Sequence, residues 1–288
     1  MQATRRTLIT GAAATLGGAV LLSSRPARAA AAVAQELEVI GLAGLVGSEA
    51  KDPDGFCPSG IELNPGSATA TLLWTQFGED RTLAGFGMTS AKLEQAMLMA
   101  PAEDFRLRSL VAQGGDLYGV LFERGGQPAP ALYHRRQTAA EYQAMVTTAS
   151  RSGMEPVQVS VDNHDGAPRF TTLLRRSTTA WEARHGVKPA ELSALTTAMK
   201  AKGLRPARLT PYLDGGQLRF LTLYRPAGRH AWESWTLSAP DFASRVQRHA
   251  QEGYALLQAT RYDVGGATLW VGIWQKAAGV PQDYFWGV

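Results

Sequence analysis

Apolar and polar residues alternate along several short stretches of the chain, and each stretch ends at a turn. Val157, Val159 and Val161 alternate with Gln158 and Ser160, a period of two that predicts a half-buried strand. The turn sequence NHDG over 163–166 follows, and the apolar run over 169–175 predicts a second strand. A weaker third strand and a helix are expected after these two strands.

The pattern then repeats. RFTTLLR over 169–175 recurs about fifty residues later as RFLTLYR over 219–225, and again as LWVGIWQ over 269–275. Two more divergent copies precede these, with second strands over 117–123 and 69–75. The copies begin near five positions along the chain, namely Phe56, Phe105, Met154, Leu204 and Tyr254, and the last copy stops after its second strand.

The helices of the repeat are predicted from their ends. Thr138 and Ser238 each stand three residues before an acidic residue, the spacing of an N-terminal capping box. Gly153, Gly203 and Gly253 share one spacing and are expected to end the helices, because glycine adopts a left-handed conformation at little cost.

These elements predict an α+β fold of tandem β-β-(β)-α units of about fifty residues. Each unit has an apolar helix stripe and an apolar strand face that it cannot bury alone, so neighbouring units must stack. We expect a curved antiparallel sheet, an arc or half-barrel, with helices on one face. The five copies span 56–276, a linker or capping segment spans 30–55, and an aromatic tail over 277–288 is expected to cover the open end.

The formal charge of +4 lies entirely in the first 29 residues. That segment holds Arg5, Arg6, Arg25 and Arg28 and no acidic residue. The arginine pair at its start precedes an apolar run over 8–22, and the segment ends with the triplet Ala27-Arg28-Ala29. This layout predicts a twin-arginine export signal, hence a periplasmic or secreted protein with no transmembrane segment after cleavage. The remainder is formally neutral, which argues against nucleic acid as a partner.

Candidate chemistry is sparse. Cys57 is the only cysteine, and its surroundings match no catalytic signature, so a small hydrophobic role is expected. The five histidines include no pair at metal-ligand spacing, and Ser48 with Lys51 forms a Ser-x-x-Lys match that we interpret as chance. The sequence therefore predicts no catalytic residue, no metal and no cofactor.

The second strands are apolar on both faces. One face carries aromatic residues in each copy and the other carries Leu or Ile, so one face must lie under the helices and the other needs a further cover. We expect the aromatic face to belong to the core, with a ligand-binding stripe as the alternative.

The first strands carry polar residues that recur in register. They form a repeated polar and aromatic face made of Gln158, Arg208, Gln258, Thr210, Thr260, Tyr212 and Tyr262. Such a face is either solvated or lines a concave groove, the usual binding surface of repeat arrays. These seven residues are the candidate binding residues.

The repeat resembles a known family. GLRPARLT over 203–210, Tyr212, the glycines at 215 and 216, Arg219-Phe220, Trp232 and the helix from Ser238 are similar to the bacterial tandem repeat domain, also found as the amino-terminal region of fungal polyglycine hydrolases. The resemblance covers 56–276 and is strongest over 154–276. In those hydrolases catalysis belongs to a separate serine domain similar to β-lactamases, which this chain lacks room for. The resemblance therefore implies a binding or targeting role.

Three functions follow as alternatives. The first is an exported, non-catalytic repeat protein that binds an unidentified protein, a peptide or a cell-envelope component through the repeated polar face. The second is a peptide or glycan hydrolase whose site is assembled between repeats. The third is a structural protein that assembles with itself.

Overall fold

The computed structural model describes residues 6–9, 19–22, 35–41, 56–65, 67–76, 82–125, 132–228 and 231–276. Its helices are α1 (Ser90–Met99), the 3-10 turn η2 (Ala100–Glu103), α2 (Ala139–Arg151), α3 (Pro189–Ala201) and α4 (Ala239–Gln251). Its strands are β1 (Arg6–Ile9), β2 (Ala19–Leu22), β3 (Gln35–Gly41), β4 (Phe56–Asn64), β5 (Thr69–Gln76), β6 (Thr82–Thr89), β7 (Phe105–Ala112), β8 (Leu117–Arg124), β9 (Leu132–Gln137), β10 (Met154–His164), β11 (Ala167–Arg176), β12 (Glu182–Val187), β13 (Leu204–Asp214), β14 (Gln217–Pro226), β15 (Trp232–Ser238), β16 (Tyr254–Val264) and β17 (Ala267–Lys276).

Local chemistry explains the boundaries of these elements. The Thr138 hydroxyl accepts a hydrogen bond from the Glu141 amide, and the Glu141 carboxylate accepts one from the Thr138 amide, so the predicted capping box of α2 is present. The turn between β10 and β11 places Asp165 at φ 53° and Gly166 at φ 76°. Two consecutive left-handed residues match the right-handed twist of a hairpin, which is why glycine recurs at the second position.

Four sheets share one topology. Each contains a hairpin of a first and a second strand, and the second strand also pairs with a strand that precedes the helix, giving the orders β6-β8-β7, β9-β11-β10, β12-β14-β13 and β15-β17-β16. All of these pairings are antiparallel. The structural unit is therefore strand, helix, strand, strand.

A fifth sheet contains the first hairpin and has the order β1-β2-β3-β5-β4. In it, β3 pairs with β5 from Gln35 opposite Thr75 to Gly41 opposite Thr69. β3 thus occupies the place that β6, β9, β12 and β15 take in the other sheets. This strand belongs to the segment 30–55, for which the sequence predicted a linker or cap.

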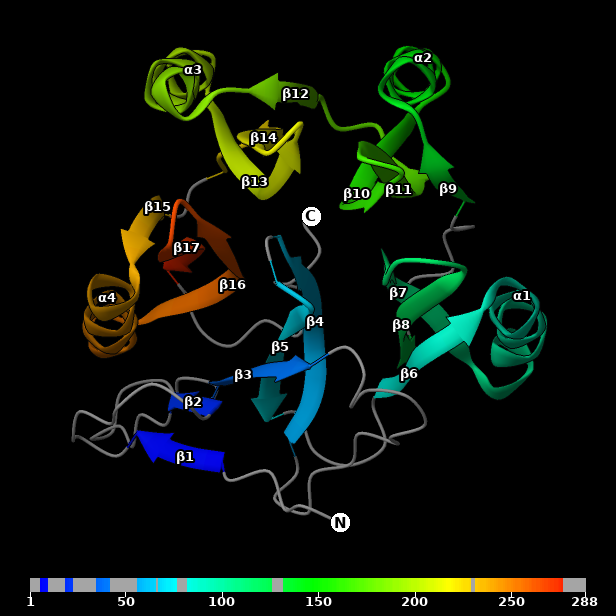
Figure 1. Cartoon of the computed structure of the whole chain (residues 1–288), viewed down its shortest axis with the longest axis horizontal. Coiled ribbons are helices and arrows are strands. Elements are labelled where there is room, and N and C mark those ends of the chain that lie inside the picture. The colour runs from blue at the N-terminus through cyan, green and yellow to red at the C-terminus, as the bar shows by residue number, and fades with distance from the viewer. Residues whose placement is uncertain are drawn as a thin grey trace.

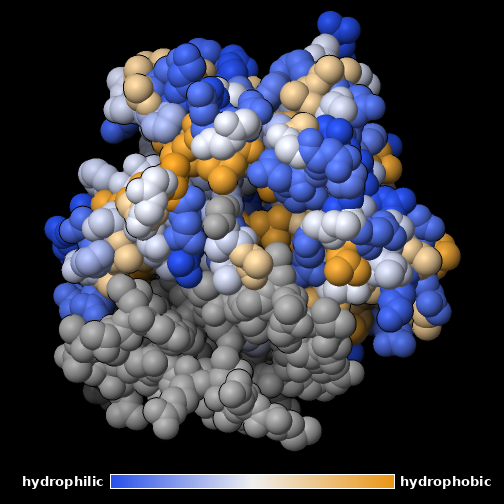
Figure 2. Space-filling model, in the orientation of Figure 1, coloured by the Kyte–Doolittle hydropathy of each residue, from blue (hydrophilic) through white to orange (hydrophobic). Residues whose placement is uncertain are grey.

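The sheets stand in a ring, with the first strands toward the middle and the helices outside (Figure 1). Consecutive first strands pack against one another, from β4 through β7, β10 and β13 to β16. The last of them, β16, packs back against β4, where the Asp263 amide donates to the Pro65 carbonyl at 2.9 Å. Over the described part of the face seen in Figure 2, the surface is mainly hydrophilic, with apolar patches near the middle and a few at the outer edge.

The predicted α+β class and the tandem units are confirmed. The sequence predicted one continuous curved sheet, an arc or half-barrel, whereas the structure contains separate sheets arranged in a ring. Each of the four repeated sheets ends at the strand that precedes its helix, which forms the outer edge of that sheet. The sheets stay separate, and side-chain packing between them produces the curvature. No helix within the described residues is long and apolar enough to cross a membrane.

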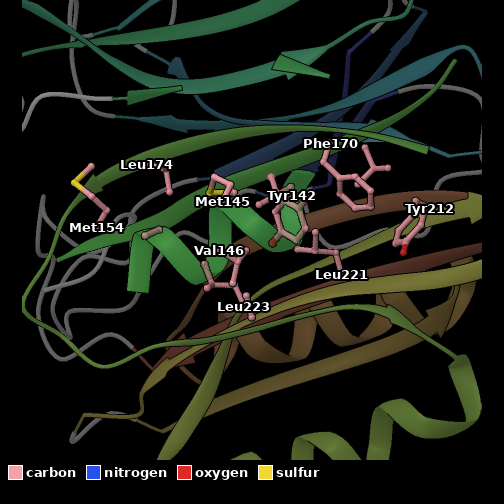
Figure 3. Close-up of a cluster of buried hydrophobic side chains, with 13 residues drawn as sticks. Tyr142, Met145, Val146, Met154, Phe170, Leu174, Tyr212, Leu221 and Leu223 are labelled. Carbon is pink, nitrogen blue, oxygen red and sulfur yellow. The ribbon is translucent and has the colours of Figure 1, made fainter. Parts of the chain in front are cut away.

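Both faces of the second strands are buried, as expected of a core. Under α2, Tyr142 stacks on Phe170 with ring centroids 4.8 Å apart (Figure 3). Leu221 and Leu223 of β14, in the next unit, pack against the same cluster. The leucine face of one unit therefore covers the aromatic and helical face of the unit before it.

The same arrangement closes the ring. Leu73 of β5, 4 % exposed, packs among Phe242, Val246, Trp270 and Trp274 of the last unit. The cover that the Leu and Ile face requires is thus another repeat, and this holds at the joint between the ends of the array as well.

Candidate functional site

The seven residues of the repeated polar face lie in the interior of the ring. None of them is more than 8 % exposed. They occupy the first strands β10, β13 and β16, which face the neighbouring sheets rather than solvent. An open groove lined by these side chains is therefore not what the structure contains, and their hydrogen bonds explain the periodicity instead.

Gln258 bonds to the backbone of the preceding first strand. Its side-chain carbonyl accepts from the Leu209 amide at 3.0 Å, and its amide donates to the Leu209 carbonyl at 2.9 Å. Gln158 joins two strands, since it accepts from the Leu110 amide at 2.8 Å and donates to the Ile61 carbonyl at 3.0 Å. A side-chain amide thus replaces the backbone partner that a continuous sheet would supply.

The threonines belong to the same joints. The Thr210 hydroxyl donates to the Val159 carbonyl at 3.2 Å, and the Thr260 hydroxyl accepts from the Gln258 side chain at 3.0 Å. Buried polar groups need such partners, because an unpaired one costs about 1–3 kcal/mol. The register of hydroxyls and amides along the first strands is therefore explained by the packing of sheet on sheet.

The two tyrosines contact the neighbouring unit through their rings. The Tyr212 hydroxyl accepts from the Gly186 amide at 2.8 Å, and its ring meets Phe170 edge-on at 5.7 Å between centroids. Tyr262 meets Phe220 edge-on at 6.1 Å. Burial raises the pKa of Tyr262 to about 12, so both phenols remain neutral at physiological pH.

Arg208 connects two hairpins that are far apart in the sequence. Its guanidinium contacts the Glu62 carboxylate of β4 at 2.5 Å, and its Nε donates to the Val157 carbonyl at 3.4 Å. Glu62 is 5 % exposed, and burial raises its pKa to about 7, although the Arg208 charge opposes that rise. Burial also lowers the pKa of Arg208. The pair is thus a buried charge contact between the first and fourth hairpins.

A second group of charges surrounds Glu155, which is 1 % exposed. Its carboxylate contacts Arg175 at 2.6 Å and Arg225 at 3.3 Å, and Arg225 also donates to the Pro156 carbonyl at 3.1 Å. Burial lowers the pKa of Arg225 to about 10; Glu155 opposes this, and the charges of Arg175, Arg208 and Arg205 add to it. We call Arg175, Arg205, Arg208 and Arg225, with Glu62 and Glu155, the arginine cluster.

Counted over the described residues that define it, the arginine cluster contains four guanidiniums and two carboxylates. The Arg175 side chain is 27 % exposed, so one edge of the cluster reaches solvent while its centre does not. Guanidinium groups present planar pairs of donors that match carboxylate and phosphate oxygens. Chemically, this arrangement suits an anion better than any other ligand class.

Sequence reasoning found Arg208 but missed the rest of the arginine cluster. Arg175 and Arg225 are the final residues of the repeated strand motif, and Glu155 is the second residue of the first strand β10. Their recurrence was visible, but only the strand pairing places Glu155 opposite Arg175 and sets Arg225 beside it. Glu62 had no periodic signal, because the other first strands carry Val, Ser or Thr at that position.

The remaining candidates carry less chemistry. No group of three or more His, Cys, Asp or Glu within the described part of the chain is placed to hold a metal ion. His249 is 1 % exposed and lies between Glu233 and Glu252, at 3.2 Å from each, where it fastens α4 to β15. The Cys57 side chain, Ser48, Lys51, His230 and the tail over 277–288 lie outside what the structure describes.

The chain matches the family described as polyglycine hydrolase-like, structural repeat, over residues 128–175, 178–226 and 230–277. Each match begins before an outer strand and ends within one residue of the end of a second strand, the same unit that the sheets define. The protein therefore belongs to this repeat family, as its resemblance to the bacterial tandem repeat domain implied. No curated protein matches the chain.

Proposed function

We propose that this protein is an exported, non-catalytic binding module whose ring takes an anionic group of a peptide or cell-envelope component at the arginine cluster. The observation that carries the proposal is the charge of the cluster, with four guanidiniums against two carboxylates in a largely buried setting. Guanidinium groups form paired, charge-assisted hydrogen bonds with carboxylates, and such bonds are stronger in a largely buried setting than at the surface.

The arginine cluster also retains one residue of the original hypothesis. Arg208 belongs to it, whereas the glutamines, threonines and tyrosines of the repeated polar face are engaged in joints between sheets. We therefore place the proposed binding surface at the solvent-exposed edge of the arginine cluster, near Arg175, and not along the whole repeated polar face.

Isothermal titration with pentaglycine tests the binding role, because only the terminal carboxylate of the acetylated peptide carries charge. We expect the acetylated peptide to bind and its C-terminal amide to bind at least about tenfold more weakly, equivalent to about 1.4 kcal/mol. Arg225→Gln should weaken the carboxylate peptide by a similar factor.

Arg184→Gln is the matched control, since its side chain is 51 % exposed and pairs with Glu182 away from the cluster. It should bind as the wild type does. Equal affinity for the carboxylate and the amide, or unchanged affinity in a correctly melting Arg225→Gln variant, would overturn the proposal.

The export part of the proposal rests on the arginine pair and the Ala27-Arg28-Ala29 triplet. Replacing Arg5 and Arg6 by lysine should retain the full-length precursor in the cytoplasmic fraction, while the wild type appears shortened in the periplasm. Equal periplasmic amounts of both would refute twin-arginine export.

A further inference from the structure

The outer strands β6, β9, β12 and β15 form the free edges of the four repeated sheets. Three of them are interrupted by a β-bulge, where two residues oppose one residue of the second strand. The second bulged residue has positive φ each time, at Gly87 (63°), Arg136 (50°) and Gly186 (73°). A bulge of this kind twists an edge and prevents another strand from pairing with it.

β15 differs from the other three. It pairs with β17 without interruption over all seven residues, from Trp232 opposite Gln275 to Ser238 opposite Leu269. It contains no residue with positive φ. The cause is one missing residue, because Trp235 stands three residues before the helix cap Ser238, whereas His134 stands four before Thr138 at the matching position.

The side chains of β15 are accessible as well. None of its seven residues is buried, and Trp235, the central residue, is 40 % exposed. Two neighbours contact the Trp235 ring: its indole N–H donates to Glu233 at 2.7 Å, and the Arg245 guanidinium lies 4.4 Å from the ring centroid. β15 lies at the periphery of the ring, beside α4 (Figure 1).

We propose that β15 pairs antiparallel with β15 of a second copy of this chain, about a two-fold axis at Trp235. The two sheets would then form one six-stranded sheet across the dimer. A regular strand with free N–H and C=O groups on its outer side is the template that such pairing requires.

The sequence of β15 is complementary to itself in this register. The two Trp235 side chains face each other at the centre, Ser234 meets Thr236, and Trp232 meets Ser238. Glu233, the only charged residue of the strand, falls opposite Leu237, so no like charges are directly opposed. This self-complementarity favours a second copy as the partner, because pairing with an unrelated peptide would not require β15 to match its own sequence.

A seven-residue strand buries a small surface, so the dimer should be weak. Interfaces below roughly 1,200 Å² of total buried area are typical of transient complexes. We expect a monomer at about 1 μM and a growing dimer fraction toward about 200 μM, measured by sedimentation equilibrium of the full chain.

A charge exchange at the two-fold axis tests the contact itself. Trp235→Lys and Trp235→Glu should each be monomeric at about 200 μM, because like charges would meet at the centre. An equimolar mixture of the two variants should regain the dimer, as a Lys and a Glu then face each other. Loss of folding cannot mimic this rescue.

Two further variants keep the test specific. Leu132→Lys changes a residue of the bulged strand β9 that is 52 % exposed, and it should leave the dimer intact. Inserting one glycine between Trp235 and Thr236 restores the spacing of the sister strands and should abolish dimerisation. A monomeric wild type at about 200 μM, or a mixture that stays monomeric, would overturn the proposal, whatever the outcome of the pentaglycine titration.

Discussion

The contact between Arg208 and Glu62 gives the sharpest test of how the ring is held together. The two side chains come from hairpins 146 residues apart, and neither is more than 8 % exposed. Removing one partner of a buried ion pair typically costs about 3–5 kcal/mol, because the remaining charge is left buried and unpaired. Arg208→Met should therefore destabilise the protein by about this amount at pH 8.5, where Glu62 is ionised.

The loss should shrink at lower pH. The folded-state pKa of Glu62 is raised to about 7 from the ordinary value of 4.5. At pH 5.5 the folded protein therefore holds a neutral Glu62, and Arg208→Met no longer strands a carboxylate. By the same linkage, the contribution of Glu62 to stability is fully present below about pH 4.5 and is lost as the pH rises through about 7, by up to about 3 kcal/mol.

The assay is urea unfolding of four proteins at pH 5.5 and 8.5, namely the wild type, Glu62→Gln, Arg208→Met and the double variant. At pH 8.5 the double variant should lie within about 2 kcal/mol of the wild type, less than the sum of the single losses. Strictly additive losses, or an Arg208→Met loss that is the same at both pH values, would refute the reasoning.

Three further predictions concern the joints and the core. Gln258→Leu should lower the free energy of unfolding by about 2–3 kcal/mol, because a backbone N–H and C=O of the neighbouring strand lose their partners, and urea unfolding measures this. Gly272→Ala should lower the melting temperature, since a Cβ there would lie 2.0 Å from the Trp274 ring; a variant that melts with the wild type would contradict that contact. Leu73→Ala should cost about 2–5 kcal/mol by opening a cavity at the closing joint, while Leu98→Ala, at a residue 82 % exposed, should change the unfolding midpoint little.

Much of the fold follows from local signals in the sequence. Alternating residues in β10, the glycines of the hairpin turns and the hydroxyl caps at Thr138 and Ser238 determine their elements within a few residues, so their positions could be predicted. Because the unit is repeated, each of these local patterns occurs in several copies, which strengthens the prediction of each element. The local signals did not predict that each outer strand pairs with the second strand that follows its helix, because that pairing joins segments separated by the helix and a first strand.

The candidate site shows the same limit more strongly. Gln158 and Gln258 recur in register whether they face solvent, a ligand or a neighbouring backbone, so their periodicity alone cannot distinguish these environments. Their burial depends on the ring, and the ring depends on Leu73 meeting the last unit. Glu62 and Glu155, which complete the arginine cluster, appear once each and carry no repeated pattern.

The joint between β16 and β4 gives the array a fixed copy number. In an open solenoid each added repeat finds a free end to stack on, so length can vary without disturbing the existing interfaces. In this protein the first hairpin packs against the last unit, through Leu73 and through the hydrogen bond between Asp263 and Pro65, so neither end is left for another repeat to stack on. A duplicated or deleted unit would have to break that joint, so we expect the closed array to accept substitutions and loop insertions more readily than a change in its number of units.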